Sequence, residues 1–207
     1  MNSLKGKFIV FDGNEGCGKS TQAKMLQSAL EKAGVDVLLV RDPGTTRIGE
    51  MIRQILLDPT NTEISMRCEM LLYMAARAQM MKEIILPALN AGKCVVSDRF
   101  VSSTLAYQLG GDGLNADEIR RVGDVAVSGR WPDLTILLDM PVEQSSHRLK
   151  GRPDRIEQRP REYHEKVREN YLAQAKLDPK RIRILSADGQ PENVHADVLK
   201  TLTSFFK

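Results

Sequence analysis

Cysteine and histidine are scarce in this chain, with three of each among 207 residues. The cysteines are Cys17, Cys68 and Cys94, an odd number without paired spacing, so a disulfide framework is not expected. The histidines have no metal-ligand spacing, which argues against a His or Cys metal site. A reducing compartment, the cytoplasm, is the expected location.

A strong charge of one sign and long apolar runs are also missing. The formal net charge is only +3, and basic residues are spread among acidic ones except in an Arg-rich segment, residues 150–161. This segment is poor in apolar residues, so it is expected to lie on the surface and not in the core. No apolar run reaches the length that crosses a membrane. We therefore expect neither a nucleic-acid nor a membrane partner, but a basic pocket for a small anion. The length is typical of a single domain, residues 1–207.

Short apolar runs alternate with amphipathic stretches. Strands are predicted at 8–11, 37–40, 94–97, 134–138 and 182–185. Helices are predicted at about 20–33, 46–57, 64–91, 115–128, 142–150, 160–177 and 191–205. This alternation predicts an α/β fold with a parallel sheet, which binds ligands at the carboxyl ends of its strands. Aspartates stand at four of these ends and are expected to face the cleft: Asp12, Asp42, Asp98 and Asp139.

The first predicted strand leads into a glycine-rich segment. Residues 13–20 read Gly-Asn-Glu-Gly-Cys-Gly-Lys-Ser, the phosphate-binding pattern of two glycines separated by four residues and followed by Lys and Ser. Between a strand and a helix, the backbone N–H groups of such a loop point at an anion. Lys19 would reach the β- and γ-phosphates of a nucleoside triphosphate, and Ser20 would bind Mg²⁺. The residues expected to bind the nucleotide are Gly13, Asn14, Glu15, Gly16, Cys17, Gly18, Lys19, Ser20 and Thr21.

Two motifs of GTPase switches, Asp-x-x-Gly and Asn/Thr-Lys-x-Asp, do not occur in the sequence. Their absence argues against a GTPase. The phosphate loop alone leaves two other readings open. One is a kinase that acts on a different nucleotide or on a nucleoside, and the other is a protein that binds nucleotide as a regulatory switch.

Three further segments occur in order along the chain. They are Arg41-Asp42-Pro43-Gly44-Thr45-Thr46; Asp98-Arg99-Phe100 with Ser103, Thr104 and Ala106-Tyr107-Gln108; and Asp154-Arg155-Ile156-Glu157-Gln158 followed by Val167-Arg168-x-x-Tyr171. With the phosphate loop they resemble bacterial-type thymidylate kinases over nearly the whole chain. The resemblance implies transfer of the γ-phosphoryl group of ATP to dTMP. It also implies a P-loop three-layer α/β/α fold with a five-stranded parallel sheet, a helical lid at about 150–161, and a homodimer.

The resemblance assigns roles to charged residues near the phosphates. Mg²⁺ would be held by Ser20 and, through water, by Asp98. Arg99 would hold the acceptor phosphate, because a guanidinium binds phosphate through two hydrogen bonds. Arg53 would be a second contact to this phosphate. Glu15 is expected to approach the 3′-hydroxyl of the acceptor or to order the metal shell.

A catalytic arginine is expected from the lid. Another branch of the family has arginine in the phosphate loop at the position of Gly16. In this chain the positive charge of that arginine must come from Arg152 or Arg155. Arg155 is favoured because it lies within the Asp-Arg-Ile-Glu motif that resembles the family. A closing lid would also exclude water from the reaction.

The resemblance places base recognition on the predicted long helix. Tyr73 would stack on thymine and Arg77, four residues later and on the same helix face, would donate to its O4. Ser103 and Thr104 would reach the base edge, and Tyr107 would occupy the space of a ribose 2′-hydroxyl. Further contacts are implied for Asp42 and Gln108 with the acceptor and for Arg148 and residues 186–190 with adenine. Asp42, Thr45 and Phe100 depart from the usual Glu, Gly and Tyr.

Overall fold

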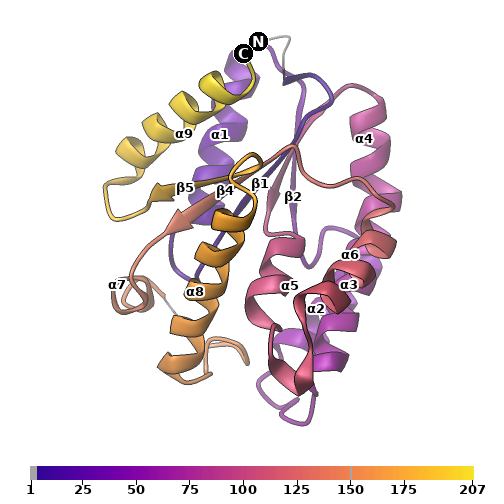
Figure 1. The fold of residues 1–207 in the computed structure, drawn as a ribbon. Helices are drawn as coiled ribbons and strands as arrows, with labels where there is room; N and C mark the ends of the chain where they lie inside the picture. Colours follow the sequence, from indigo (N-terminus) through magenta and orange to yellow (C-terminus); the bar gives the residue numbers. More distant parts are fainter. Residues whose placement is uncertain (1–3, 150) are drawn as a thin grey trace.

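The computed structural model describes residues 4–149 and 151–207. Five parallel strands form one sheet in the order β2-β3-β1-β4-β5 (Figure 1). The strands are β1 (Phe8–Gly13), β2 (Val37–Arg41), β3 (Cys94–Asp98), β4 (Leu134–Asp139) and β5 (Ile182–Ser186). Each begins where the sequence predicts and extends one or two residues further. The predicted α/β fold with a five-stranded parallel sheet is confirmed.

Helices cover both faces of this sheet (Figure 1). They are α1 (Lys19–Lys32), α2 (Arg47–Leu57), α3 (Met66–Met80), α4 (Leu86–Asn90), α5 (Val101–Tyr107), α6 (Ala116–Val127), α7 (Val142–Ser146), α8 (Arg161–Leu177) and α9 (Pro191–Phe205). A π-helical turn, η2 (Met81–Ile85), joins α3 to α4, and a 3₁₀ turn, η3 (Gly111–Gly113), precedes α6. In the part of the chain that the structure describes, no helix has the length and apolar content to cross a bilayer.

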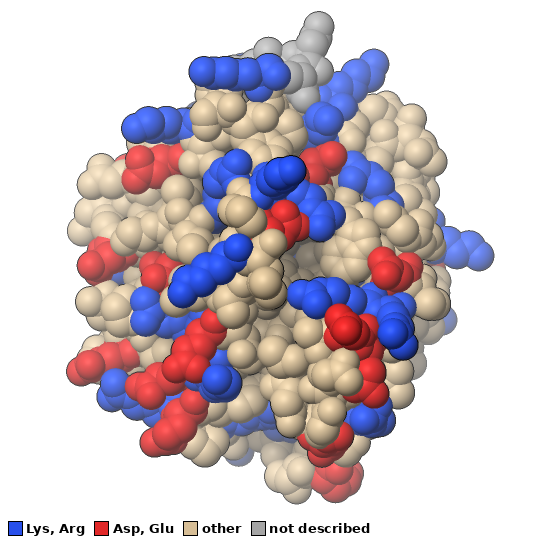
Figure 2. All heavy atoms as spheres, viewed as in Figure 1, with Lys and Arg blue, Asp and Glu red and all other residues tan. Residues whose placement is uncertain are grey.

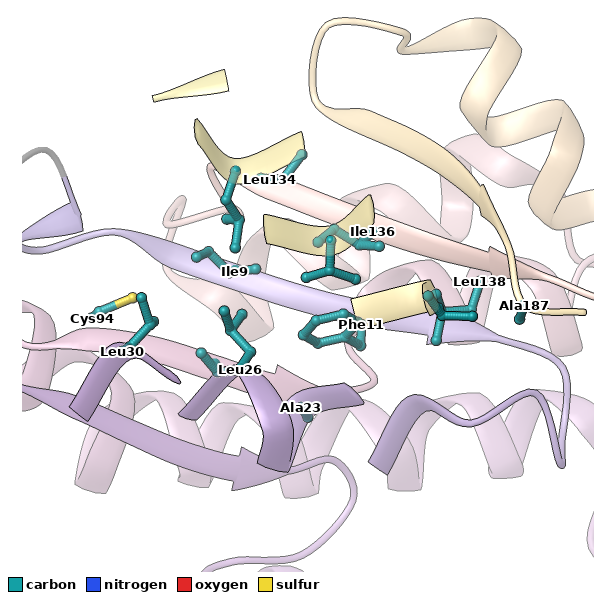
Figure 3. Packing of buried hydrophobic residues seen from close by; sticks show 14 of the residues in the cluster. Ile9, Phe11, Ala23, Leu26, Leu30, Cys94, Leu134, Ile136, Leu138 and Ala187 are labelled. Atoms are coloured by element: carbon teal, nitrogen blue, oxygen red, sulfur yellow. The ribbon is translucent and has the colours of Figure 1, made fainter. Parts of the chain in front are cut away.

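Strand β1 lies at the centre of the sheet and is buried along its whole length. Because side chains alternate along a strand, its residues serve two cores. Ile9 and Phe11 pack with α1 and α9, as Figure 3 shows for the α1 side. Phe8 and Val10 face the opposite core, which α3, α5 and α6 complete. The phosphate loop therefore extends from a fully buried strand at the centre of the sheet.

The carboxyl ends of the strands lie at one edge of the sheet. Phe11 pairs with Asp98 of β3, Arg41 of β2 pairs with Asp98 from the other side, and Gly13 pairs with Leu138 of β4. This register sets the phosphate loop, which follows β1, beside the ends of β3 and β4, with the end of β2 one strand further away. It brings together motifs that are far apart in the sequence.

Four segments differ from the sequence-based expectations. The predicted helix 64–91 is divided by η2, the predicted helix 142–150 is shorter because α7 ends at Ser146, and helix α5 was not predicted at all. The segment 150–161 was expected to lie wholly on the surface, yet Ile156 is only 3% exposed and belongs to a core cluster with α8. Its described residues before α8, 151–160, form turns, and Lys150 lies outside the described residues.

Basic and acidic side chains are intermixed on the face shown in Figure 2. Several arginines of the protein belong to ion pairs, such as Arg168 with Asp139 and Arg161 with Glu165.

Candidate active site

The phosphate loop connects β1 to α1 and depends on its glycines. Gly13, Gly16 and Gly18 all have positive φ, a region that other residues rarely adopt. Lys19 is buried where α1 begins, and its ammonium group donates to the carbonyl of Asn14 over 2.5 Å. The loop thus holds a buried positive charge at the amino end of a 14-residue helix, an arrangement suited to an anion.

Gly16, in the middle of the phosphate loop, packs against α7. A Cβ atom there would lie 2.1 Å from the carbonyl oxygen of Ser145 in α7. This neighbour is backbone, so it cannot rotate away. The packing of α7 on the loop therefore leaves no room for a side chain at this position.

A cavity opens beside the phosphate loop and is the candidate donor site. Its far wall is formed by Arg148 and the loop that follows β5, residues 187–190. The guanidinium of Arg148 donates to the carbonyl of Ala187 over 3.3 Å. The structure therefore brings together the two elements expected to flank adenine.

Oxygen ligands meet at the base of this cavity. The hydroxyl of Ser20 hydrogen-bonds Oδ2 of Asp98, and both residues line the cavity. Mg²⁺ is bound in nucleotide sites by one or two such oxygens together with the substrate phosphates. The pair fits that ligand set. Within 4–149 and 151–207, no group of three or more His, Cys, Asp or Glu side chains forms an all-protein metal site.

A second cavity lies on the other side of Arg99 and is the candidate acceptor site. Its lining residues come from the motifs at the ends of β2 and β3, from α3 and α5, and from the segment before α8. They are Glu15, Asp42, Pro43, Arg53, Leu57, Tyr73, Arg77, Arg99, Ser103, Thr104, Tyr107, Gln108, Asp154 and Ile156. Every residue that the sequence assigned to the acceptor is in this set.

Arg77 forms the floor of the acceptor cavity. Its Nε donates to Asp42 over 2.6 Å, and its two terminal nitrogens donate to the hydroxyl of Thr104 and to the carbonyl of Phe100. These contacts fix a guanidinium that is 1% exposed. Oδ1 of Asp42 has no hydrogen-bond partner in the described part of the chain. Both residues line the cavity, where Arg77 presents a guanidinium that Asp42 holds in place.

Arg99 lies between the two cavities and adopts a left-handed φ of 72°. Its guanidinium is 2.7 Å from Oε1 of Glu15 and 3.3 Å from the hydroxyl of Tyr107. Burial alone would raise the pKa of Glu15, but the charges of Arg99 and Lys19 outweigh it and lower the pKa to about 2. Glu15 is therefore a carboxylate at neutral pH, and it holds Arg99 in place.

Asp12 helps to hold the guanidinium of Arg99, a role that was not predicted from the sequence. It was expected to face the cleft, but it is fully buried and accepts hydrogen bonds from Ser102, Ser103 and Tyr171. The hydroxyl of Ser103 in turn accepts from Arg99 over 3.0 Å. Two features of the sequence could have indicated this role of Asp12: its place at the end of a strand, and the presence of Tyr171 in the last of the quoted motifs.

Arg53, on α2, reaches the boundary between the cavities. It lines both of them and donates to the carbonyl of Pro43 over 3.2 Å. Glu15, Asp42 and Arg99 also line both cavities. The two cavities therefore share one wall of two carboxylates and two guanidiniums.

The two arginines predicted for the lid lie in different surroundings. Arg152 is exposed, whereas Arg155 is buried against Glu69 of α3, with 2.5 Å between guanidinium and carboxylate. Neither arginine lines either cavity, so the structure brings neither of them to the phosphate loop. Glu69 was missed by the sequence analysis, although a glutamate four residues before Tyr73 on one helix face was visible.

Comparisons with known proteins agree with this geometry. The family model described as "Thymidylate kinase" matches residues 11–198. Thymidylate kinases of Pelotomaculum thermopropionicum and Caldanaerobacter subterraneus subsp. tengcongensis are 46% and 42% identical, covering 95% and 99% of this chain and 93% and 98% of theirs. The crystal structure of thymidylate kinase from Ehrlichia chaffeensis superposes with a TM-score of 0.79 at 30% identity, covering 96% of this chain and 99% of that one. The chain belongs to the thymidylate kinase family, whose reaction is the transfer of the γ-phosphoryl group of ATP to dTMP.

Proposed function

We propose that ATP occupies the cavity at the phosphate loop, that dTMP occupies the cavity beside Arg77, and that phosphoryl transfer takes place across Arg99. The observation that carries this proposal is the shared wall, because the two reacting phosphates must meet where the cavities join. Phosphoryl transfer requires little covalent chemistry and depends on positioning and on positive charge. The residues at this boundary supply both.

Each charged group at the boundary has a proposed task. Lys19 and the loop N–H groups hold the β- and γ-phosphates of the donor. Arg99 and Arg53 hold the phosphate of the acceptor, whose attacking oxygen then faces the γ-phosphorus. Glu15 keeps Arg99 oriented until the acceptor arrives and lies close to the expected 3′-hydroxyl. Positive charge fixed in this way stabilises the transition state without reorganising as the charge develops.

We propose that Ser20 and Asp98 hold the magnesium ion that accompanies ATP. When bound, Mg²⁺ neutralises charge on the β- and γ-phosphates. The chain's contribution is the pair of oxygen ligands at the base of the donor cavity.

We propose that side chains of α3 and α5 select the base and the sugar of the acceptor. The fixed guanidinium of Arg77 donates hydrogen bonds only, which favours the keto group of thymine over the amino group of cytosine. Tyr73 borders the same cavity and would stack on the base. The hydroxyl of Tyr107 is held between Glu15 and Arg99, where it would exclude a ribose 2′-hydroxyl. Ser103, Thr104 and Gln108 complete the lining around the base.

The segment before α8 is proposed to close over the reacting phosphates. Of the two arginines predicted to contact the transferred phosphoryl group, Arg152 is exposed. Arg155 would first have to leave Glu69. We therefore assign the phosphoryl contact to Arg152 and propose that Arg155 anchors the segment.

We also propose a homodimer and a cytoplasmic location. Met51 and Ile55 of α2, Leu71 of α3 and Val125 of α6 expose large parts of their apolar side chains, and Figure 1 shows these helices together at one side. An apolar surface of this kind is typical of an interface between subunits. All three cysteines are free, as expected in a reducing compartment.

The proposed function is tested by measuring ADP release from Mg·ATP with dTMP, dUMP, ribose TMP, dCMP, AMP and thymidine as acceptors. A kcat/KM at least 100-fold higher for dTMP than for dCMP and AMP is expected. Preferred phosphorylation of thymidine would instead indicate a nucleoside kinase. Binding of ATP without phosphorylation of any acceptor would support the donor site but contradict the kinase activity, and it would favour a regulatory switch.

A further inference from the structure

Glu69 of α3 is a fully buried carboxylate that the catalytic roles above do not use. Its Oε2 accepts hydrogen bonds from Arg155 over 2.5 Å and from Arg159 over 2.7 Å. Its Oε1 accepts from the side-chain amide of Gln108 over 2.7 Å. One carboxylate on α3 thus binds two arginines of the segment before α8 and the residue that follows α5.

These partners lead directly to the acceptor cavity. Gln108 lines it, as do Asp154 and Ile156, the two neighbours of Arg155. On α3, Tyr73 lies one turn beyond Glu69 and also borders the cavity. Glu69 therefore contacts or adjoins three parts of the cavity lining: helix α3, Gln108 after α5, and the segment before α8.

The two arginines are held by further contacts of their own. Nε of Arg155 donates to the carbonyl of Leu56, at the end of α2, over 2.7 Å. The guanidinium of Arg159 lies over the ring of Tyr163, 4.5 Å from its centre. Two like charges brought this close are stable together only while an anion lies between them. Without the carboxylate of Glu69, residues 151–160 would lose the attachment that holds both arginines.

We propose that Glu69 is a positioning residue, which fixes residues 151–160 against the acceptor cavity by binding Arg155 and Arg159 together. The proposal rests on the assignment of this cavity to dTMP. It deepens that assignment because it names the residue that holds the cavity wall in place. Glu69 lines neither cavity, so its effect on the acceptor must pass through the segment or through Gln108.

The test compares Glu69→Gln with Glu165→Gln in the full chain. Glu165 also pairs with an arginine near the segment, Arg161, but the pair is exposed on α8. Glu69→Gln is expected to raise KM for dTMP at least tenfold while KM for ATP changes less than twofold. Hydrogen exchange of residues 151–160, measured with dTMP present, should increase at least tenfold, while that of β1 and β3 stays unchanged. Glu165→Gln should match the wild type in every measurement.

Arg155→Met and Arg159→Met provide the test if Glu69→Gln does not fold. Each is expected to raise KM for dTMP at least threefold and to increase exchange of 151–160. The double variant Glu69→Gln, Arg159→Met should have a KM for dTMP and an exchange rate of residues 151–160 no higher than those of Glu69→Gln alone. Both changes act through one contact, so their effects do not add.

The inference is overturned if the variants only lower thermal stability, with uniform changes in exchange and an unchanged KM for dTMP. It is likewise overturned if KM for ATP rises as much as KM for dTMP. A wild-type protein that does not phosphorylate dTMP would contradict the proposed function instead. The two failures are therefore distinguishable.

Discussion

Replacing Gly16 by alanine tests whether the packing of α7 fixes the sequence of the phosphate loop. The added Cβ would meet the carbonyl oxygen of Ser145 at 2.1 Å, well inside contact distance. The backbone at Gly16 also has a φ of 74°, which is strained for any residue with a side chain. Two separate costs are thus expected, and a matched variant separates them.

Gly34 is that matched position. Its φ of 76° is nearly the same, it lies after α1 away from both cavities, and a Cβ there would meet nothing within 4 Å. Gly34→Ala should therefore cost only the left-handed strain, about 1–2 kcal/mol. Gly16→Ala should cost this and a further ~1–3 kcal/mol from overpacking.

The difference is measured by urea unfolding and by thermal melts of both variants. A further 2 kcal/mol corresponds to roughly 4–8 °C in Tm for a chain of this size. ATP affinity should fall in Gly16→Ala only, because Arg148 follows α7 and borders the donor cavity. Equal losses of stability in the two variants would refute the steric argument.

Three further variants test the boundary between the cavities. Arg99→Ala should lower dTMP turnover by about two orders of magnitude, because it removes charged hydrogen bonds of about 1.5–3 kcal/mol each, while ATP binding measured by calorimetry persists. Turnover at the wild-type rate would exclude Arg99 as the phosphate contact. Tyr107→Phe should reduce the preference for dTMP over ribose TMP about tenfold in paired kcat/KM measurements, and an unchanged ratio would remove Tyr107 from sugar selection. The pKa of Glu15 is lowered from 4.5 to about 2, so its carboxylate stabilises the fold above pH 4.5 and this effect is lost as the pH falls toward 2. The difference in unfolding free energy between wild type and Glu15→Gln should accordingly shrink between pH 5 and 3, and a difference independent of pH would contradict the ion pair with Arg99.

The fold was predictable because strand and helix periods alternate so regularly in this sequence. All five strands were found, since each is an apolar run bounded by polar residues. Helix α5 was missed because its Val-Ser-Ser-Thr start has neither an apolar stripe nor a strong helix propensity. Its polar residues bond instead to Asp12 and Arg77, so tertiary contacts decide its conformation.

The residues assigned to the acceptor all line its cavity, both those quoted in a motif, such as Arg99, and those placed on the predicted long helix, such as Arg77. Glu69 and Asp12 were missed as site residues because their roles depend on partners far away in the chain, such as Arg155 and Tyr171. The Arg-rich segment was misread as wholly exposed for the same reason. A buried guanidinium is tolerated only beside an anion, and the sequence gives no direct sign of which anion that is.

The shared wall between the cavities also bears on how this chain could vary. A substitution at Glu15, Asp42, Arg53 or Arg99 alters the surroundings of both substrates at once. Residues that border only one cavity, such as Tyr73 or Arg148, can change while the other substrate keeps its contacts. The positions most free to change during adaptation to a new acceptor or donor are therefore those that border one cavity only. The four residues of the shared wall are the least free to change.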